Sequence, residues 1–410
     1  MPTTNPKLYL LSASSVAAFK ACPTRFRLAY REGLRLAEDT ESQRVGTNWH
    51  QMHECYANAL ADRETLEGCS LEAKNDYALA CVVDLLNDRY VLHCPNYKTA
   101  FEWALERQVL LTCFIGYLWY YTNDPVEFLA SEVPFELPLH SPRTGLPLST
   151  DEVLRVGKID HVIRWQGMVG ALERKSTSRS IDPASDYWDK SKKDTQVSMY
   201  ALAFKDMVNA DPMRDPFGAD CDRFGTTLYD VWHKPTIKPK MLTQAETREF
   251  AWGETKGRYC GQSFNVETVN QDDTPDLVAR VIVDGEQCEV EHGKKGFAIR
   301  ETVGMFGARL LADIYERPDF YFVRREIVRT DAEIQHFRKQ LYAVYQSQRL
   351  MEKHGTWFEN EQQCRATFPC PYIPICYGPG STSVCDGKTT PPNFKRIFVD
   401  LTVNGQEAEE

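Results

Sequence analysis

Two hydrophobic periods alternate along the chain and divide it into helical and strand-like stretches. Before residue 130, apolar residues recur every three to four positions, which is typical of amphipathic helices. Three helices are predicted there, at 48–63, 71–91 and 100–121. Apolar and polar residues then alternate in three segments, 132–139, 153–165 and 168–177. These segments are predicted to be strands, and Gln166-Gly167 is expected to form a hairpin turn between the last two.

Further elements are predicted on both sides of this region. Beyond residue 190 they are a helix over 194–208, strands at 226–233 and 317–330, and a helix over 331–355 capped by Asp331. Residues 234–300 show only one helical piece, near 243–256. At the N-terminus, Ser12 or Ser14 is expected to cap a first helix, which Pro23 breaks or restarts, and a second helix should end near Gly33.

Composition narrows the class of protein. The chain has 410 residues, enough for about two to three domains, with 42% apolar and 26% charged residues. These values are ordinary for a folded protein and exclude a disulfide-stapled miniprotein or a coiled coil. No run approaches the roughly 18 apolar residues of a membrane-spanning helix. The N-terminus lacks the pattern of a signal peptide. We therefore expect a cytoplasmic protein without membrane contact.

The charge is unevenly distributed. The formal net charge is −10, which argues against a protein coated in nucleic acid. Basic residues nevertheless cluster near the N-terminus, where a local face for DNA is predicted at Lys20, Arg25, Arg27 and Arg31. The alternative is that these cations pair with the surplus acidic residues.

The segment 156–177 carries the residues most suited to catalysis. Asp160 lies on the first strand of the predicted hairpin, and Glu173 and Lys175 lie two apart on the second. Residues two apart on a strand share a face, and the hairpin can bring Asp160 next to that face. Two carboxylates suit Mg²⁺ or Mn²⁺, and an ammonium can orient water and stabilise charge on a phosphoryl group. The alternative for three such common residues is a surface hairpin with an ordinary salt bridge.

The surrounding motifs resemble the PD-(D/E)XK nuclease superfamily, in particular its RecB-like branch. The segments follow the family order across residues 12–204: LSASSVAAFKACPTRFRLAY, GTNWHQMHE, SEVPFEL, GKID, ALERKST and DTQVSMYALAF. The resemblance implies roles in metal binding for His50, Glu132, Asp160 and Glu173. It implies that Gln196 and Tyr200 of the QxxxY helix serve the catalytic site with Lys175. His53 stands close to His50 and leaves the choice of histidine open.

The same resemblance implies a fold and an activity. The expected fold is α/β, a small mixed sheet flanked by helices in a restriction-endonuclease-like core, with a helical insertion and a Cys-rich C-terminal segment. The expected activity is metal-dependent hydrolysis of DNA, in particular exonuclease action in phage or bacterial recombination, repair or defence, with a helicase or recombination protein as a possible partner. A non-catalytic DNA-binding or assembly subunit and an enzyme acting on RNA are the alternatives. No GxxxxGK[ST] motif is present, so the chain is not expected to be an ATP-driven motor.

The C-terminal cysteines form a second candidate site. The chain has 13 cysteines, and Cys364, Cys370 and Cys376 are spaced C-x5-C-x5-C. Iron–sulfur nucleases related to AddB and to the CRISPR-adaptation nucleases use one N-terminal and three C-terminal cysteines, so the resemblance implies a [4Fe–4S] cluster that includes Cys22. Those families usually have a tighter spacing before the last cysteine. Zinc at the same thiolates and structural cysteines without metal remain the alternatives.

These elements and motifs suggest an order of domains along the chain. The expected parts are the N-terminal helices of the nuclease domain with Cys22 and His50 at 1–50, a helical insertion at 51–130, the catalytic core at 131–235, an accessory α/β part at 236–355, and a Cys-rich clasp and tail at 356–410.

Overall fold

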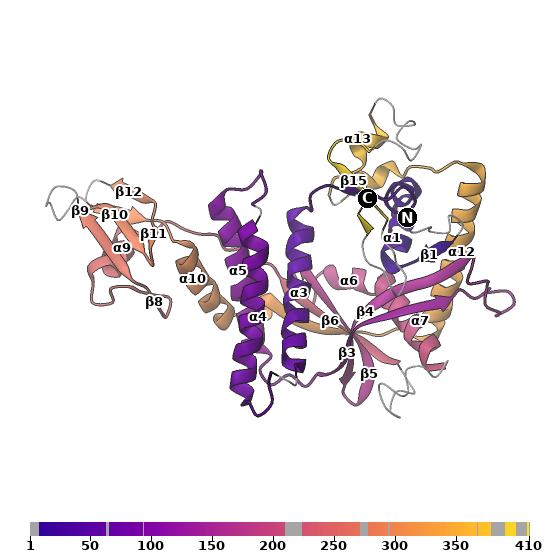
Figure 1. Cartoon of the computed structure of the whole chain (residues 1–410), viewed down its shortest axis with the longest axis horizontal. Coiled ribbons are helices and arrows are strands. Elements are labelled where there is room, and N and C mark those ends of the chain that lie inside the picture. The colour runs from indigo at the N-terminus through magenta and orange to yellow at the C-terminus, as the bar shows by residue number, and fades with distance from the viewer. Residues whose placement is uncertain are drawn as a thin grey trace.

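The computed structural model describes most of the chain. The described residues are 8–62, 65–92, 94–209, 224–270, 278–293, 296–366, 368–378, 390–398 and 408–409. Within them, helices cover both sides of a central sheet, and a smaller β-rich unit projects from one end (Figure 1). The α/β fold expected from the sequence is confirmed.

The central sheet is six-stranded and mixed, with the order β1-β4-β5-β6-β14 and with β3 beside β4. Its strands are β1 (Tyr9–Leu11), β3 (Glu127–Pro138), β4 (Val153–Trp165), β5 (Met168–Thr177), β6 (Phe224–His233) and β14 (Phe322–Ile327). The β1–β4 and β5–β6 pairs are parallel, and the other pairs are antiparallel. Gln166 and Gly167 both have positive φ and join β4 to β5, so the predicted hairpin is present.

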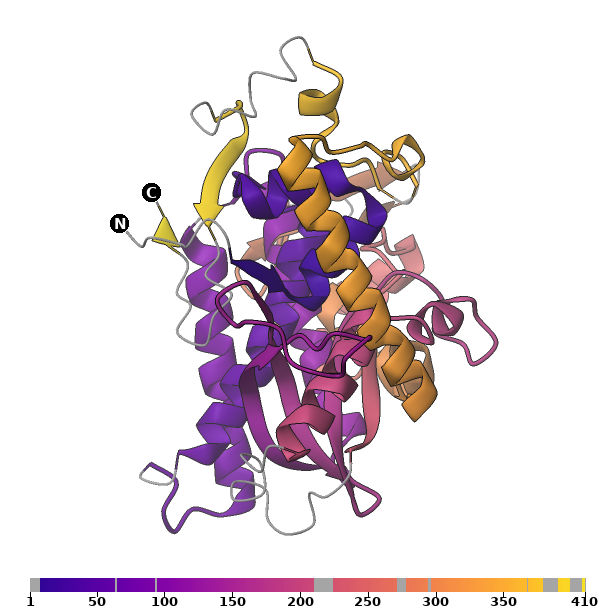
Figure 2. The same cartoon turned by 90° about the vertical axis from the view of Figure 1, so that its right-hand side faces the viewer.

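One face of the sheet is covered by α1 (Ala13–Ala21), α7 (Thr195–Asn209) and α12 (Asp331–His354). Their apolar side chains form one buried cluster with Val153, Ile159 and Val162 of β4. Figure 2 shows α12 crossing in front of α1 and the sheet, so the last long helix closes this layer. Burial of such apolar stripes is the main force that holds helix and sheet together.

The structure confirms the expected starts of the first two helices and corrects the expected cap of α12. Ser12 caps α1 and exchanges hydrogen bonds with Ser15. Pro23 begins α2 (Pro23–Phe26), which continues into a π-helical turn (Arg27–Arg31). The expected cap of α12 at Asp331 is wrong, because the Thr330 hydroxyl accepts from the backbone N–H of Glu333 and fills that position. The Asp331 carboxylate instead pairs with Lys205 of α7 at 2.6 Å.

The other face is covered by three long helices, α3 (Glu41–Ala61), α4 (Leu71–Leu92) and α5 (Ala100–Tyr120). Trp49 of α3 stacks on Trp232 of β6, with ring centroids 4.2 Å apart, which ties these helices to the sheet. α3 begins seven residues earlier than the hydrophobic period predicts and runs without a break through residue 50. No helix among the described residues is long and apolar enough to cross a membrane.

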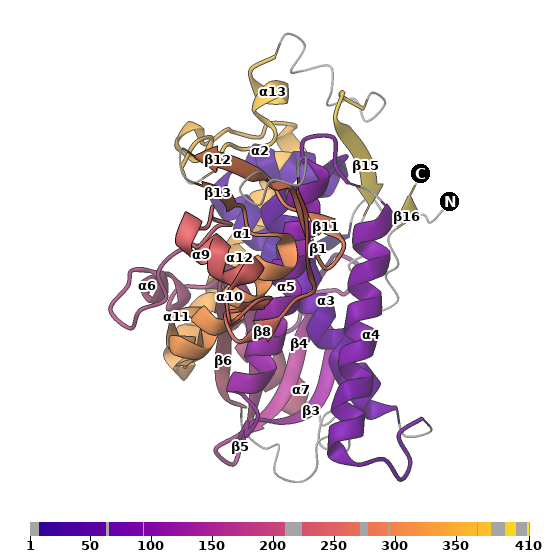
Figure 3. The same cartoon turned by 90° about the vertical axis from the view of Figure 1, so that its left-hand side faces the viewer.

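The β-rich unit lies between β6 and β14 in the sequence. It contains α9 (Gln244–Trp252), β7 (Arg258–Tyr259), β8 (Gln262–Ser263), β9 (Val266–Asn270), β10 (Val278–Val283), β11 (Glu286–Gln287), β12 (Val290–Gly293) and β13 (Gly296–Ile299). Its residues have their own apolar core, which includes Leu242, Phe250 and Val281. The following helix, α10 (Val303–Glu316), packs on α5 (Figure 3). The predicted strand at 317–330 is shorter than expected, because Pro318 begins the short helix α11 (Pro318–Tyr321) before β14.

The C-terminal segment packs against the N-terminal helices. It contains a 3₁₀ turn (Glu361–Gln363), α13 (Ile373–Cys376), β15 (Phe394–Phe398) and β16 (Ala408–Glu409). β15 pairs antiparallel with β2 (Leu34–Leu36), which follows the π-helical turn. Tyr372 donates a hydrogen bond to the carbonyl of Leu34 at 2.8 Å. The two ends of the chain are therefore held side by side by backbone and side-chain contacts.

Candidate active site

The long strand β4 has a gap in its pairing, and the candidate site lies at this gap. Along one edge, β3 pairs with β4 from Leu154 to Arg164. On the other edge, β1 pairs with the start of β4 as far as Arg155, and β5 pairs with its end from His161 onward. No described strand covers residues 156–160 on that edge. The backbone and side chains of this stretch are therefore available to other elements.

Asp160 and Glu173 lie where the two hairpin strands separate. His161 is paired with Leu172; Asp160 lies one residue before His161, and Glu173 lies one residue after Leu172. They consequently point to the same face of the sheet. Lys175 lies two residues beyond Glu173, and its ammonium is 2.5 Å from Glu173 Oε1. The structure thus brings together the three residues that the sequence singled out.

Gln196 and Tyr200 of α7 join this group from the side of the gap. The amide of Gln196 donates to Glu173 Oε2 at 3.0 Å and to the Tyr200 hydroxyl at 2.8 Å, and its oxygen accepts from Lys175 at 2.7 Å. The Tyr200 hydroxyl donates to the carbonyl of Lys158 at 2.7 Å. Because Lys158 lies in the unpaired stretch of β4, Tyr200 takes the place of a neighbouring strand there.

The structure separates the two candidate histidines. His50 of α3 points to the site, with Nδ1 3.6 Å from Asp160 Oδ2. His53, one turn later, is buried against Trp49, Phe114 and Tyr117. Burial lowers the pKa of His50, and the negative charge of Asp160 only partly opposes this effect. A neutral imidazole is the form that binds metal ions.

Glu132 lies at the edge of the site in a strained conformation. It has a φ of 54°, in the left-handed region that non-glycine residues rarely adopt, although it belongs to β3. Its carboxylate forms an ion pair with Lys158 of β4. It is close enough to His50 for its charge to raise the pKa of that imidazole. Strained residues of this kind concentrate at functional sites.

The electrostatics of the buried pair favour a bound cation. Glu173 is only 1% exposed, and burial raises the pKa of its carboxyl even though Lys175 acts in the opposite direction. Burial alone would lower the pKa of Lys175, but the attraction of Glu173 outweighs it and the pKa is raised. Asp160 Oδ2 is buried without a hydrogen-bond partner, whereas Glu173 Oε1 has the Lys175 ammonium at 2.5 Å. Two carboxylates beside one ammonium leave negative charge that an additional cation would compensate.

The donor set of the site suits Mg²⁺ better than a metal held by protein side chains alone. Among the described residues, no three His, Cys, Asp or Glu side chains form a group that could hold a metal ion. Mg²⁺ needs less from the protein, because it keeps several waters and binds through one or two carboxylates and substrate phosphates. Asp160 and Glu173 are two such carboxylates, and Asp160 Oδ2 has no hydrogen-bond partner, so they fit that requirement. Metal ligation by His50 and Glu132 stays a prediction.

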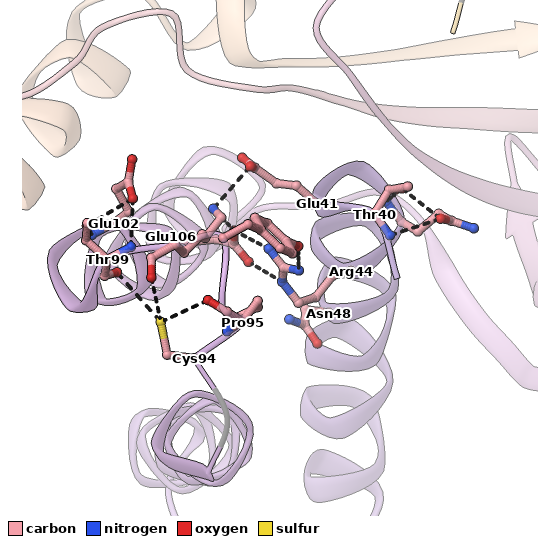
Figure 4. A network of polar contacts seen from close by, with 12 residues as sticks. Thr40, Glu41, Arg44, Asn48, Cys94, Pro95, Thr99, Glu102 and Glu106 are labelled. Atoms are coloured by element: carbon pink, nitrogen blue, oxygen red, sulfur yellow. Dashed lines mark hydrogen bonds and ion pairs between the residues drawn. The ribbon is translucent and has the colours of Figure 1, made fainter. Parts of the chain in front are cut away.

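The helix that carries His50 is held in place by a buried polar network (Figure 4). Glu106 of α5 is 7% exposed and accepts two hydrogen bonds from Arg44 of α3, both at 2.8 Å. Lys98 and the Tyr90 hydroxyl also donate to it, at 2.5 and 2.7 Å. A bidentate arginine–carboxylate pair fixes orientation as well as distance. The insertion thereby fixes the position of α3, six residues before His50.

The four cysteines lie in one region but not as a preformed centre. The backbone N–H of Asn360 donates to Cys22 at 3.4 Å, and Cys364 contacts the carbonyl of the same residue at 3.9 Å. Cys370 and Cys376 border one small apolar cluster with Tyr372 and Ile375. Burial raises the pKa of Cys376 to about 11, and the neighbouring Cys370 adds to the shift. With no metal-holding group among the described residues, the structure gives the iron–sulfur prediction no direct support. Cys385 lies outside the described residues.

The predicted DNA-binding cations differ in their surroundings. Lys20 and Arg25 are exposed, although Lys20 donates to Gln340 at 3.1 Å. Arg31 is engaged, because it pairs with Glu352 at 2.9 Å and lies 4.3 Å from the centre of the Tyr9 ring. Arg27 is half-buried and already has a partner. A role in DNA binding therefore fits Lys20 and Arg25 most easily and stays a prediction for all four.

Sequence reasoning missed one residue that shapes the site. Asp194 precedes α7, and its carboxylate accepts from the backbone N–H groups of Gln196 at 2.6 Å and Val197 at 3.3 Å. These N–H groups belong to the first turn of a helix, which has no internal acceptor for them. An Asp directly before a helical period was the available signal. Because Asp194 caps the helix two residues before Gln196, it helps to fix the backbone that carries the Gln196 amide side chain.

The fold and the site together define a restriction-endonuclease-like nuclease. A family model described as the PD-(D/E)XK nuclease superfamily matches residues 10–377, which is nearly the whole described chain. The chain belongs to the PD-(D/E)XK nuclease superfamily. A search of curated proteins found no match. Membership implies nuclease activity with DNA as the substrate, and members of the superfamily usually use divalent metals.

Proposed function

We propose that the protein is a Mg²⁺- or Mn²⁺-dependent deoxyribonuclease that acts as an exonuclease in phage or bacterial DNA recombination, repair or defence. The observation that carries the proposal is the set of contacts that join Glu173, Lys175 and Gln196 at the gap in β4, together with the Tyr200 hydroxyl 3.4 Å from Asp160 Oδ1. The exonuclease action and the RecB-like assignment rest on the order of the sequence motifs. Cytoplasmic location and cooperation with a helicase or recombination protein belong to the same proposal.

Each residue of the site has a distinct role in this proposal. Asp160 and Glu173 hold the cation, which supplies Lewis acidity and lowers the pKa of water when bound. Lys175 cannot bind a metal while charged, so it orients water and stabilises charge on the phosphoryl oxygens. Gln196 fixes the positions of Glu173 and Lys175 relative to each other. Tyr200 closes the gap in β4 and fixes the amide of Gln196.

The second candidate function is a non-catalytic DNA-binding or assembly subunit that keeps the nuclease fold. A chain of that kind has no need for the buried Glu173–Lys175 pair, whose desolvation is costly without a catalytic use. The complete set of carboxylates, lysine and glutamine therefore favours the enzyme. Hydrolysis of RNA by the same site is separated from DNA hydrolysis by the choice of substrate in the assay.

We also propose that Cys22, Cys364, Cys370 and Cys376 bind a [4Fe–4S] cluster, with zinc as the competing metal. The support is the thiolate donor set and the contacts that bring Cys22 and Cys364 to the same backbone segment at Asn360. Such a centre stands apart from the hydrolytic residues. Its expected contribution is to hold the C-terminal segment on the N-terminal helices.

The decisive experiment is cleavage of 5′- and 3′-labelled single- and double-stranded DNA in Mg²⁺, Mn²⁺ or EDTA. The wild-type protein should release mononucleotides or short products from an end, and EDTA should stop the reaction. Asp160→Asn and Glu173→Gln should abolish cleavage while the fold and weak DNA binding persist. Glu127→Gln is the matched control, because Glu127 lies on the neighbouring strand and pairs with Arg164 at the surface. Full activity of either active-site variant would sink the assignment.

A further inference from the structure

The start of α7 is held by an arginine from a distant part of the chain. Arg329 lies between β14 and α12 and is half-buried. Its Nε donates to Ser198 Oγ at 3.0 Å, and one terminal nitrogen lies 3.0 Å from the carbonyl oxygen of Ser191 and 3.4 Å from that of Asp194. A single planar guanidinium therefore contacts the end of α6 (Tyr187–Ser191), the cap of α7 and the first turn of α7.

These contacts surround Gln196 along the chain. Asp194, two residues before it, caps the helix, and Ser198, two residues after it, donates back to the carbonyl of Asp194 at 2.9 Å. Arg329 is bonded to both of these neighbours. The backbone around Gln196 is thus fixed at both sides by the same side chain.

The position of Gln196 matters because two catalytic residues depend on it. Its amide is bonded to Glu173 and to Lys175 at 3.0 and 2.7 Å, so a displacement of the helix start changes both contacts together. A misplacement of about 1 Å can cost about 10²-fold in rate even when it originates away from the chemistry.

We propose that Arg329 is a positioning residue that acts through Gln196 on the Glu173–Lys175 pair. This inference rests on the proposed function, because it assigns an effect on hydrolysis to a residue that does not contact the carboxylates. The accessory part of the chain thereby contributes to the catalytic core, and Arg329 couples the two.

The experiment compares Arg329→Ala with Arg325→Ala. Arg325 is a matched control, because it lies on β14, donates to the carbonyl of Pro183 at 3.2 Å and covers the Trp188 ring, and neither of these contacts reaches α7. We expect Arg329→Ala to lower kcat by about 10- to 100-fold with little change in KM for DNA. Arg325→Ala should keep wild-type kcat. Equal losses in both variants would overturn the proposal in favour of a general structural effect.

A double variant separates positioning from an independent contribution. If Arg329 acts through Gln196, then Gln196→Ala with Arg329→Ala should be no slower than Gln196→Ala alone. A loss equal to the product of the two single losses would overturn the proposed route.

A measurement without substrate keeps the inference separate from the proposed function. Hydrogen–deuterium exchange of the backbone amides at 196–198 should become faster in Arg329→Ala and stay unchanged in Arg325→Ala. Unchanged exchange in Arg329→Ala would refute the positioning role whether or not the protein cleaves DNA. If the wild-type protein does not cleave DNA but exchange is still faster in Arg329→Ala, the proposed function is lost and the link between Arg329 and α7 stands.

Discussion

Replacement of Tyr200 by phenylalanine tests the gap in β4 most directly. The change removes only the hydroxyl, which donates to the Lys158 carbonyl at 2.7 Å, accepts from Gln196 at 2.8 Å and lies 3.4 Å from Asp160 Oδ1. The ring remains in the buried cluster that joins α7 to the sheet. Any effect therefore reports on the contacts of the hydroxyl and not on a cavity.

The expected loss of stability follows from the two shorter bonds, to Lys158 and Gln196. A typical hydrogen bond contributes about 0.5–1.5 kcal/mol net, so two bonds predict a loss of about 1–3 kcal/mol. With about 2.1 cal/mol/K of unfolding entropy per residue, a chain of 410 residues that unfolds as one unit should lose about 1–3 °C in Tm. Loss of one of the partners of Gln196 should also lower kcat about tenfold, which corresponds to about 1.4 kcal/mol in the barrier.

The assays are calorimetry and single-turnover cleavage of labelled DNA, with Tyr315→Phe as the control. Tyr315 is 44% exposed and contacts Trp119 through its ring, so loss of its hydroxyl should change neither Tm nor rate. A Tyr200→Phe protein with wild-type Tm and wild-type rate would refute the idea that this hydroxyl replaces a strand at the gap.

Three further predictions concern the catalytic lysine, the basic face and the cysteines. Lys175→Ala should bind metal but turn over about 10²–10³-fold more slowly, and a loss of metal affinity with an intact metal-saturated rate would show that its role is different. Arg25→Glu should weaken DNA binding and reduce the dependence of affinity on salt, measured by anisotropy titrations at several salt concentrations. Arg31→Glu should instead lower mainly the Tm, because it breaks the ion pair with Glu352. Protein purified without oxygen should be brown and contain iron and sulfide, and Cys370→Ser should lose both and unfold at a lower temperature. A colourless preparation that contains zinc would identify the site as a zinc site. A metal-free preparation of full stability would show that the cysteines are structural residues.

The order of the long elements can be predicted from the sequence, because each of them shows a hydrophobic period over many residues. The helices α4 and α5 and the strands β4 and β5 lie where the period changes place them. The small strands between residues 258 and 299 escape prediction, because segments of two to six residues give too little periodicity to recognise. The error at Asp331 has a similar origin, since Thr330 and Asp331 are both good capping residues and only the backbone decides between them.

The site residues also differ in how far the sequence alone can predict them. Asp160, Glu173 and Lys175 can be brought together from strand geometry alone, because their spacing is local. The choice of His50 over His53 needs the packing of α3 against Phe114 and Tyr117, which no local pattern contains. The contact of Arg329 with the start of α7 joins residues 131 positions apart, and such long-range pairs are invisible to periodicity.

The closure of the sheet by α12 has a consequence for the order in which the molecule is assembled during synthesis. All the catalytic side chains lie before residue 201, but the apolar surface of α7 and α1 is buried by Phe337, Leu341 and Tyr345 of α12. At a translation rate of about 5–20 residues per second, roughly 8–30 s separate the emergence of Tyr200 from that of the end of α12. During that interval the nascent chain carries every catalytic residue on an incompletely covered core. The ribosome-bound protein is therefore expected to gain a stable active site only when α12 has left the exit tunnel.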